Sequence, residues 1–302
     1  MSSTKTEILE HYREIDFSLW EKIVNTSCDK LRKLKTNKAK RVWALQLYST
    51  YLQLIEVFCI NTFVVVENVL WENLFLNNSD LRRKITRRFY SIHQNRQIYS
   101  DQFPNFLIEN WVFGIKEKEK INNLPSKMHM YSVLLKEAIE DYLKDYDFLN
   151  AYKHGFRVKS HGETNLTAKI EGRDSKAFRL AAYNSSISYL KRQDGTIVQE
   201  DILFNWERVI QKAFFLLNMM ENIQKVLLSN GEEILLQTLA VEDEVEFSKF
   251  FGSGRFRMPL THKNTSITSD ALQTNSGPLI IKNSALPSTF VFLQLSRQIN
   301  MD

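Results

Sequence analysis

The residues best suited to chemistry lie where a long amphipathic pattern ends, in residues 149–157. Asn150 and His154 are four residues apart, so a helix would place both on one face. Lys153 lies beside them, and Arg157 follows shortly after. A titratable imidazole within reach of an amide and two cations could handle a phosphate group. His154, Asn150, Lys153 and Arg157 are therefore the candidate catalytic residues.

The same stretch also suits a structural helix end. Lysine and histidine side chains in a last helical turn interact favourably with the helix dipole and with the final carbonyl groups. Gly155 is well placed to end the helix in the left-handed conformation. The catalytic and structural interpretations of His154 both stay open at this point.

Helical spacing covers most of the chain. Apolar residues three and four apart predict one or two short helices in residues 8–34 and longer ones over 37–76, 82–93, 106–121, 127–154 and 201–227. Residues 77–80 are expected to cap the helix that follows them. Only 9 glycines and 5 prolines are present, which favours long helices with few connections.

The spacing changes between the last two helices. Residues 166–170 and 186–190 are typical of short strands, and Asp194-Gly195 is a hairpin turn signal. Apolar runs at 279–281 and 290–293 follow a polar segment over 261–277. We therefore predict a mainly α fold, a helical bundle over residues 1–231 with a small β insert near residues 160–200. A small β-containing or partly disordered C-terminal appendage is predicted over residues 232–302.

The net charge of +5 is unevenly distributed. Two dense basic runs occupy residues 30–41 and 82–88, and such runs attract RNA, DNA or anionic membranes. The alternative is that both are solvated loops and helix ends. The candidate nucleic-acid-binding residues are Lys33, Lys35, Lys38, Arg82, Arg83, Arg87 and Arg88.

Several other chemistries lack their motifs. The 6 histidines never pair at helical spacing or with a cysteine pair, so no metal site is predicted. No phosphate-binding glycine loop, dinucleotide loop or serine nucleophile elbow occurs, so no cofactor is expected. Cys28 and Cys59 form no motif and are expected to be buried thiols in a reducing compartment.

The sequence favours a cytoplasmic protein. The N-terminal residues lack the charged and then apolar pattern of a secretion signal. Residues 52–70 approach the length of a membrane span, but polar and acidic residues interrupt them every turn or two. Carboxylates are costly inside a membrane, so we expect a buried bundle helix and no membrane span.

Long bundle helices with an Asn-x-x-x-His element at a helix end resemble the HEPN superfamily. Asn150 and His154 match the Arg-Asn-x-x-x-His motif of its ribonucleases, and Leu149 stands where that motif has arginine. The resemblance covers residues 37–231 in architecture but only two residues in motif. It implies a metal-independent endoribonuclease of toxin or antiviral defence type. His154 would act as general acid or base at a ribose 2′-hydroxyl, and Asn150 would orient it.

The resemblance further implies a homodimer that brings two motifs together, and a protein partner in a defence or toxin system. Leucine cannot bind the scissile phosphate, so Lys153 or Arg157 would have to supply the cation. Arg87 or Arg88 with His93 gives a second spacing of arginine and histidine, but it lacks the asparagine that follows the arginine in the motif. The alternative is a non-catalytic HEPN-like binding or scaffold protein that has lost the arginine.

The sequence also predicts how five apolar side chains pack. Leu149 should pack against neighbouring helices, because burying a leucine is favourable by about 1.5–3 kcal/mol. Four tryptophans fall within helical apolar patterns and are expected in the core rather than as base-stacking platforms. They are Trp43, Trp71, Trp111 and Trp206.

Overall fold

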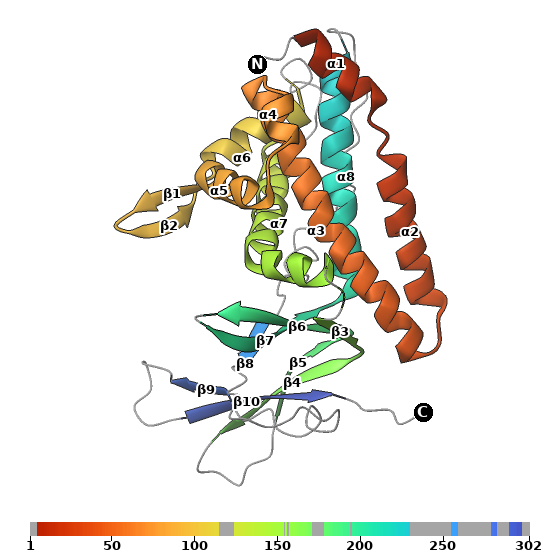
Figure 1. Ribbon diagram of the computed structural model, residues 1–302, viewed down its shortest axis with the longest axis vertical. Helices are drawn as coiled ribbons and strands as arrows, with labels where there is room; N and C mark the ends of the chain where they lie inside the picture. The colour runs from red at the N-terminus through yellow and green to blue at the C-terminus, as the bar shows by residue number, and fades with distance from the viewer. Residues whose placement is uncertain are drawn as a thin grey trace. The chain divides into compact units, whose positions relative to one another are not determined.

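The computed structural model describes residues 5–114, 124–153, 155, 157–170, 178–193, 195–229, 255–258, 279–282 and 290–297 (Figure 1). Unit 1 comprises Met1–Cys28, Leu47–Tyr146 and Val209–Ser248, and unit 2 comprises Asp29–Gln46, Asp147–Arg208 and Lys249–Asp302. The described residues are mainly helical with small sheets, which confirms the predicted fold class. The predicted boundary between residues 231 and 232 falls within unit 1 and stays a prediction.

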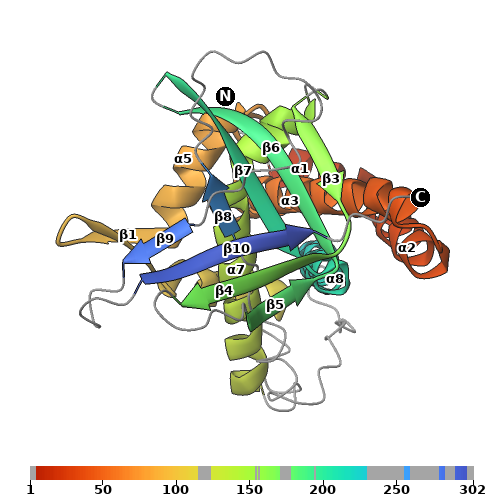
Figure 2. The ribbon, with the colours of Figure 1, turned by 90° about the horizontal axis from the view of Figure 1, so that it is seen from below.

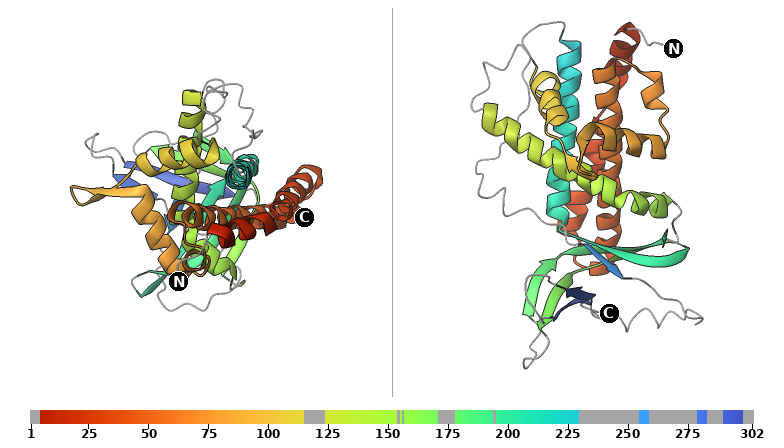
Figure 3. Two further views of the ribbon diagram at one scale, coloured as in Figure 1. Left: turned by 90° about the horizontal axis from the view of Figure 1, so that it is seen from above. Right: turned by 90° about the vertical axis from the view of Figure 1, so that its left-hand side faces the viewer.

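Unit 1 is a helical bundle. Its residues come from the helices α1 (Lys5–Glu14), α2 (Ser18–Lys33), α3 (Asn37–Glu67), α4 (Trp71–Leu74), α5 (Asn78–Phe89), α6 (Gln102–Leu107), η1 (Ile108–Val112), α7 (Leu124–Lys153) and α8 (Trp206–Leu228). In the right-hand panel of Figure 3, α3 and α8 run side by side. The Tyr12 hydroxyl of α1 donates to the Asn61 carbonyl of α3 at 2.8 Å, and Gln224 of α8 donates to the Tyr12 carbonyl at 2.5 Å. These bonds tie the three helices together.

The helix predicted over residues 37–76 is shorter in the structure. It ends at Glu67, because Asn68 adopts a left-handed φ of 55° that asparagine tolerates better than most residues. The Val69 amide then donates back to the Val64 carbonyl at 3.3 Å, the bond of a Schellman helix end. Trp71 begins the short α4 instead of continuing α3, and 46% of its surface is exposed. The prediction of a core position was therefore wrong for Trp71.

The helix predicted over residues 82–93 is also shorter. Asn77 caps α5 by accepting a bond from the Asp80 amide at 2.9 Å, as predicted, but the helix ends at Phe89. The chain continues as β1 (Tyr90–His93) and β2 (Arg96–Tyr99), an antiparallel hairpin that extends away from α5 (Figure 1). Gln94 and Asn95 both have positive φ, the arrangement of a type I′ turn.

Other helix boundaries depend on local residues. Pro104 lies in the first turn of α6, where the missing amide hydrogen costs little. The helix predicted over 106–121 is described only as far as Val112 of η1, and residues 115–121 lie outside the described residues. Gly155, with φ 65°, donates to the Tyr152 carbonyl after α7 ends at Lys153, which confirms the predicted helix end.

Unit 2 contains two antiparallel sheets (Figure 2). One has the order β3-β6-β7-β8 and the other β5-β4-β10-β9. The strands are β3 (Val158–His161), β4 (Thr164–Ile170), β5 (Phe178–Tyr183), β6 (Ser185–Gln193), β7 (Thr196–Phe204), β8 (Arg255–Met258), β9 (Leu279–Lys282) and β10 (Phe290–Arg297). Residues 201–204, predicted as the start of a helix, belong to β7, and α8 begins at Trp206. Of the last three strands, β8 pairs with β7 and β10 pairs with β4, both strands of the predicted insert, while β9 pairs with β10.

The apolar α3 is the one described helix long and apolar enough to cross a membrane. The structure buries 72% of its most apolar window, as expected for the core helix of a bundle. Cys59, on this helix, is a free, fully buried thiol whose pKa is raised by burial. Cys28 is likewise buried and free, so the predicted burial of both thiols is confirmed.

Candidate functional site

Helix α5 has one buried apolar face, and its basic side chains lie on the other faces. Leu81, Ile85 and Phe89, spaced four apart, are at most 2% exposed and form its core face. The arginines and the lysine of the helix lie on its remaining faces. The sequence therefore positions the basic residues by burying the apolar ones.

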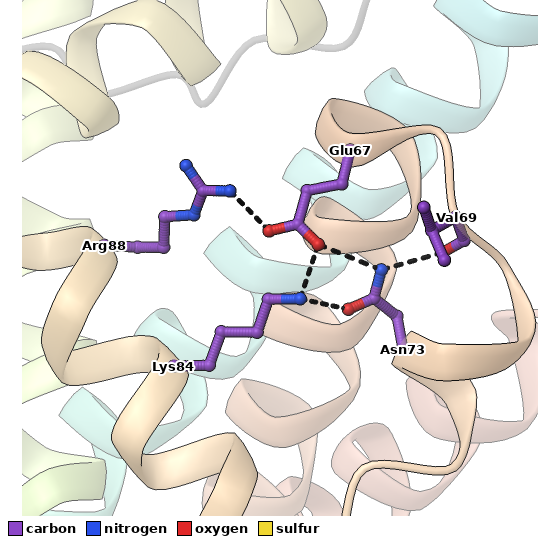
Figure 4. A network of polar contacts seen from close by, with 5 residues as sticks. All are labelled: Glu67, Val69, Asn73, Lys84 and Arg88. Atoms are coloured by element: carbon purple, nitrogen blue, oxygen red, sulfur yellow. Dashed lines mark hydrogen bonds and ion pairs between the residues drawn. The ribbon is translucent and has the colours of Figure 1, made fainter.

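Two of the α5 cations pair with Glu67 at the end of α3 (Figure 4). Lys84 and Arg88 each lie 2.5 Å from a different carboxylate oxygen of Glu67. Asn73 donates to Glu67 at 3.3 Å and accepts from Lys84. Burial tends to raise the pKa of Glu67, but the bonds from Lys84, Arg88 and Asn73 outweigh it and the pKa is lowered.

The remaining α5 cations line a cavity of about 510 Å³. The side chains that α5 contributes are spaced as one helical face, and they are Ser79, Arg82, Arg83, Thr86 and Arg87. The hairpin contributes Tyr90, Ile92 and Gln97, and α7 contributes Tyr146. We call this cavity the arginine pocket; all of its lining residues belong to unit 1.

The charges of the arginine pocket are only partly balanced. Arg83 pairs with Asp80 at 2.8 Å, whereas Arg82 stacks over the Tyr146 ring at 5.2 Å. Arg87 is exposed, and within the described part of the chain no ion pair is seen for it or for Arg82. Burial, and secondarily Glu140, raises the pKa of Tyr90 to about 12. The Tyr90 phenol therefore stays a neutral hydrogen-bond donor at physiological pH.

The described members of the predicted catalytic group lie elsewhere, in unit 2, with Asn150 and Lys153 in the last turns of α7 and Arg157 after the helix. Leu149 is only 1% exposed, which confirms its predicted packing. Asn150 is half-buried, and Lys153 and Arg157 are exposed. His154 lies outside the described residues. The phosphate chemistry predicted for this group therefore stays a prediction.

The other predicted nucleic-acid-binding residues also lie in unit 2. Lys33, Lys35 and Lys38 are exposed around the end of α2 and the start of α3. Lys33 pairs with Asp29 at 3.2 Å on the surface, an interaction of little energetic weight. The structure thus divides the predicted basic residues between two units, and it brings Arg82, Arg83 and Arg87 together in one cavity.

A buried ionic cluster in unit 1 could not be found from sequence spacing. Lys212 of α8 lies 2.8 Å from Asp141 and 3.2 Å from Glu137, both on α7. The Tyr51 hydroxyl of α3 donates to Asp141 at 2.9 Å. Lys212 is 9% exposed and Asp141 is 7% exposed. A lysine within the apolar pattern of α8 was the only local signal of this cluster.

A histidine, a serine and an aspartate meet in the sheet of unit 2. The Ser188 hydroxyl donates to Asp201 and lies 2.8 Å from Nε2 of His161. Here serine stands between the other two, whereas in a hydrolytic triad histidine takes the central place. Ser188 is 5% exposed, so the group suits sheet stabilisation better than nucleophilic attack. Among the described residues, no group of three or more His, Cys, Asp or Glu side chains could hold a metal ion.

Comparisons of the chain with known protein families, with curated proteins and with solved structures found no match. The resemblance to the HEPN superfamily therefore stays a prediction.

The Glu67 network predicts a specific response to acid. Because the folded pKa of Glu67 is lowered, its contribution to stability is present above its ordinary value of 4.5 and is lost as the pH falls through the folded pKa. The free energy of unfolding should therefore fall less between neutral and acidic pH in Glu67→Gln than in the unsubstituted protein. Urea unfolding at a series of pH values measures this, and parallel pH profiles for the two proteins would contradict it.

Proposed function

We propose that this protein binds RNA through the arginine pocket. The observation that carries the proposal is the sorting of cations on α5. Glu67 pairs with Lys84 and Arg88 outside the pocket. Arg82, Arg83 and Arg87 line one cavity. Among the described residues, the carboxylate seen to pair with one of these three is Asp80, which pairs with Arg83. A cavity with excess positive charge attracts a polyanion.

The other lining residues favour single-stranded RNA over a polyanion that has no bases. Unpaired bases stack on aromatic rings and on guanidinium groups, and the pocket offers Tyr90, Tyr146 and the stacked Arg82. Thr86 and Gln97 add polar groups that can bond to phosphate, ribose or base edges. Arginine and aromatic residues together are typical of single-strand binding sites.

The first test is the salt dependence of RNA binding. Fluorescence anisotropy with a short unstructured RNA should show affinity falling steeply between about 50 and about 200 mM salt. Reversing Arg82, Arg83 and Arg87 to glutamate should weaken binding and reduce the slope of log affinity against log salt, because each single-strand phosphate contact contributes about 0.7 to that slope. Binding that is absent or insensitive to salt would contradict the proposal.

A matched variant separates the two basic runs. The substitutions Lys33→Glu, Lys35→Glu and Lys38→Glu change the net charge by the same amount in unit 2. We expect them to weaken binding less than the reversals in the arginine pocket. A larger loss in this variant would move the binding site to the run over residues 30–41.

Ribonuclease activity is the second candidate function, favoured by the exposed Lys153 and Arg157 at the end of α7. In that mechanism either cation would replace the arginine whose motif position Leu149 occupies, and His154 and Asn150 would act as the HEPN resemblance implies. Incubating total RNA with the protein and with His154→Ala tests it. RNA that stays equally intact in both samples favours the non-catalytic binding or scaffold protein. A strictly monomeric mass in solution would count against the homodimeric active site.

A further inference from the structure

We propose that the arginine pocket recognises the terminal phosphate of an RNA strand rather than its internal phosphodiesters. The inference rests on the proposed RNA binding and names the part of the RNA that this site takes. A terminal phosphomonoester carries nearly two negative charges at neutral pH, whereas each internal phosphodiester carries one. The two kinds of phosphate therefore require different amounts of positive charge from a site.

The excess positive charge of the pocket equals the negative charge of a terminal phosphate. Asp80 offsets Arg83 at 2.8 Å, which leaves the charges of Arg82 and Arg87 as the excess. Two guanidinium groups can meet a phosphate dianion with charge-assisted, bidentate hydrogen bonds. Lys84 and Arg88 lie outside the pocket lining, and Glu67 offsets one of their two charges, so the charges of Arg82 and Arg87 are the excess within the pocket itself.

The extent of the cation cluster also favours one phosphate. Arg82 and Arg87 are five residues apart on α5, which corresponds to about 7.5 Å of helix. A groove that follows a strand spreads its cations over several nucleotides. The cavity of about 510 Å³ is instead bounded by α5, the β1–β2 hairpin and Tyr146. This volume lies in the range of sites that hold a single small ligand, such as one terminal nucleotide.

Neutral donors complete the site. A terminal phosphate presents one more free oxygen than an internal phosphodiester and can therefore accept more hydrogen bonds. Ser79, Thr86 and Tyr90 bring hydroxyl groups to the pocket, and Gln97 brings an amide. The ring of Tyr90 lines the pocket and can stack on the terminal base.

The test compares one RNA sequence in three forms: with a 5′-phosphate, with a 3′-phosphate, and with hydroxyl groups at both ends. Anisotropy should show that one phosphorylated form binds the unsubstituted protein at least about tenfold more tightly than the hydroxyl form, as expected for one added charged hydrogen bond. The end that carries the preferred phosphate identifies the strand polarity. A nucleoside monophosphate should compete with that RNA better than the nucleoside alone.

The preference must depend on the pocket. Arg82→Gln with Arg87→Gln should abolish it, whereas Arg96→Gln, on β2 but outside the pocket lining, should retain it. Thermal unfolding by circular dichroism checks that both variants fold. Should the double variant unfold, Tyr90→Phe removes a single hydroxyl while keeping the ring, and it should reduce the preference.

The outcomes separate this inference from RNA binding itself. Equal, salt-dependent affinity for all three RNAs would overturn terminal-phosphate recognition and leave the proposed function standing. A preference that persists in a folded Arg82→Gln, Arg87→Gln variant would overturn the assignment to this pocket. No binding to any of the RNAs would overturn both proposals.

Discussion

Replacing Lys212 with methionine is expected to lower the free energy of unfolding by about 3–5 kcal/mol. The substitution removes the cation that lies 2.8 Å from Asp141 and 3.2 Å from Glu137. Asp141, only 7% exposed, would then be a buried carboxylate without its compensating charge. Equilibrium unfolding in urea measures the loss.

Lys144→Met is the matched control. Lys144 pairs with Glu140 at the same 3.2 Å, but 55% of its side chain is exposed. Exposed pairs of this kind contribute about 0.3–0.5 kcal/mol, so the control should unfold almost like the unsubstituted protein. Similar losses for the two substitutions would show that burial does not make the Lys212 pairing important.

The same cluster predicts a response to alkali. Burial opposes the charged form of Lys212, but Asp141 and Glu137 outweigh it and raise its pKa above the ordinary 10.5. A raised folded pKa means that the stabilisation is complete below 10.5 and is lost as the pH rises through the folded value. The stability difference between the unsubstituted protein and Lys212→Met should therefore shrink at strongly alkaline pH.

Leu149→Arg should be comparably damaging, with an expected loss of about 3–5 kcal/mol, as for other uncompensated buried charges. Leu149 is 1% exposed near the end of α7, where its neighbour Phe148 packs edge-on against Tyr189 of β6. Leu149→Met is the control, and it should cost less than about 1.5 kcal/mol because it nearly conserves volume. Unchanged stability in Leu149→Arg would show that this position accommodates a charge.

The Leu149→Arg variant also tests the lost-arginine hypothesis. It completes the Arg-Asn-x-x-x-His pattern with Asn150 and His154. Cleavage of RNA by this variant, and its loss when His154→Ala is added, would support descent from a catalytic pattern. A stable but inactive variant would favour the helix-end interpretation of His154.

Features set by neighbouring residues were accessible from the sequence. The Asn77 cap of α5 and the Gly155 end of α7 were both predicted, because each depends on one residue and the helical turn beside it. The spacing of Leu81, Ile85 and Phe89 likewise determines which face of α5 is buried. The β1–β2 hairpin was missed because Gln94 and Asn95 adopt positive φ without a glycine to signal the turn.

The composition of the pocket was decided by the tertiary structure. Arg87 and Arg88 are adjacent and identical in type, yet Arg88 pairs with Glu67, 21 residues away, while Arg87 lines the pocket. Tyr146 reaches Arg82 from another helix, and Lys212 meets Asp141 across 71 residues of chain. Local spacing determines which residues share a helical face. Which distant side chain then meets that face depends on how the helices pack, and packing joins residues whose separation in the sequence carries no periodic signal.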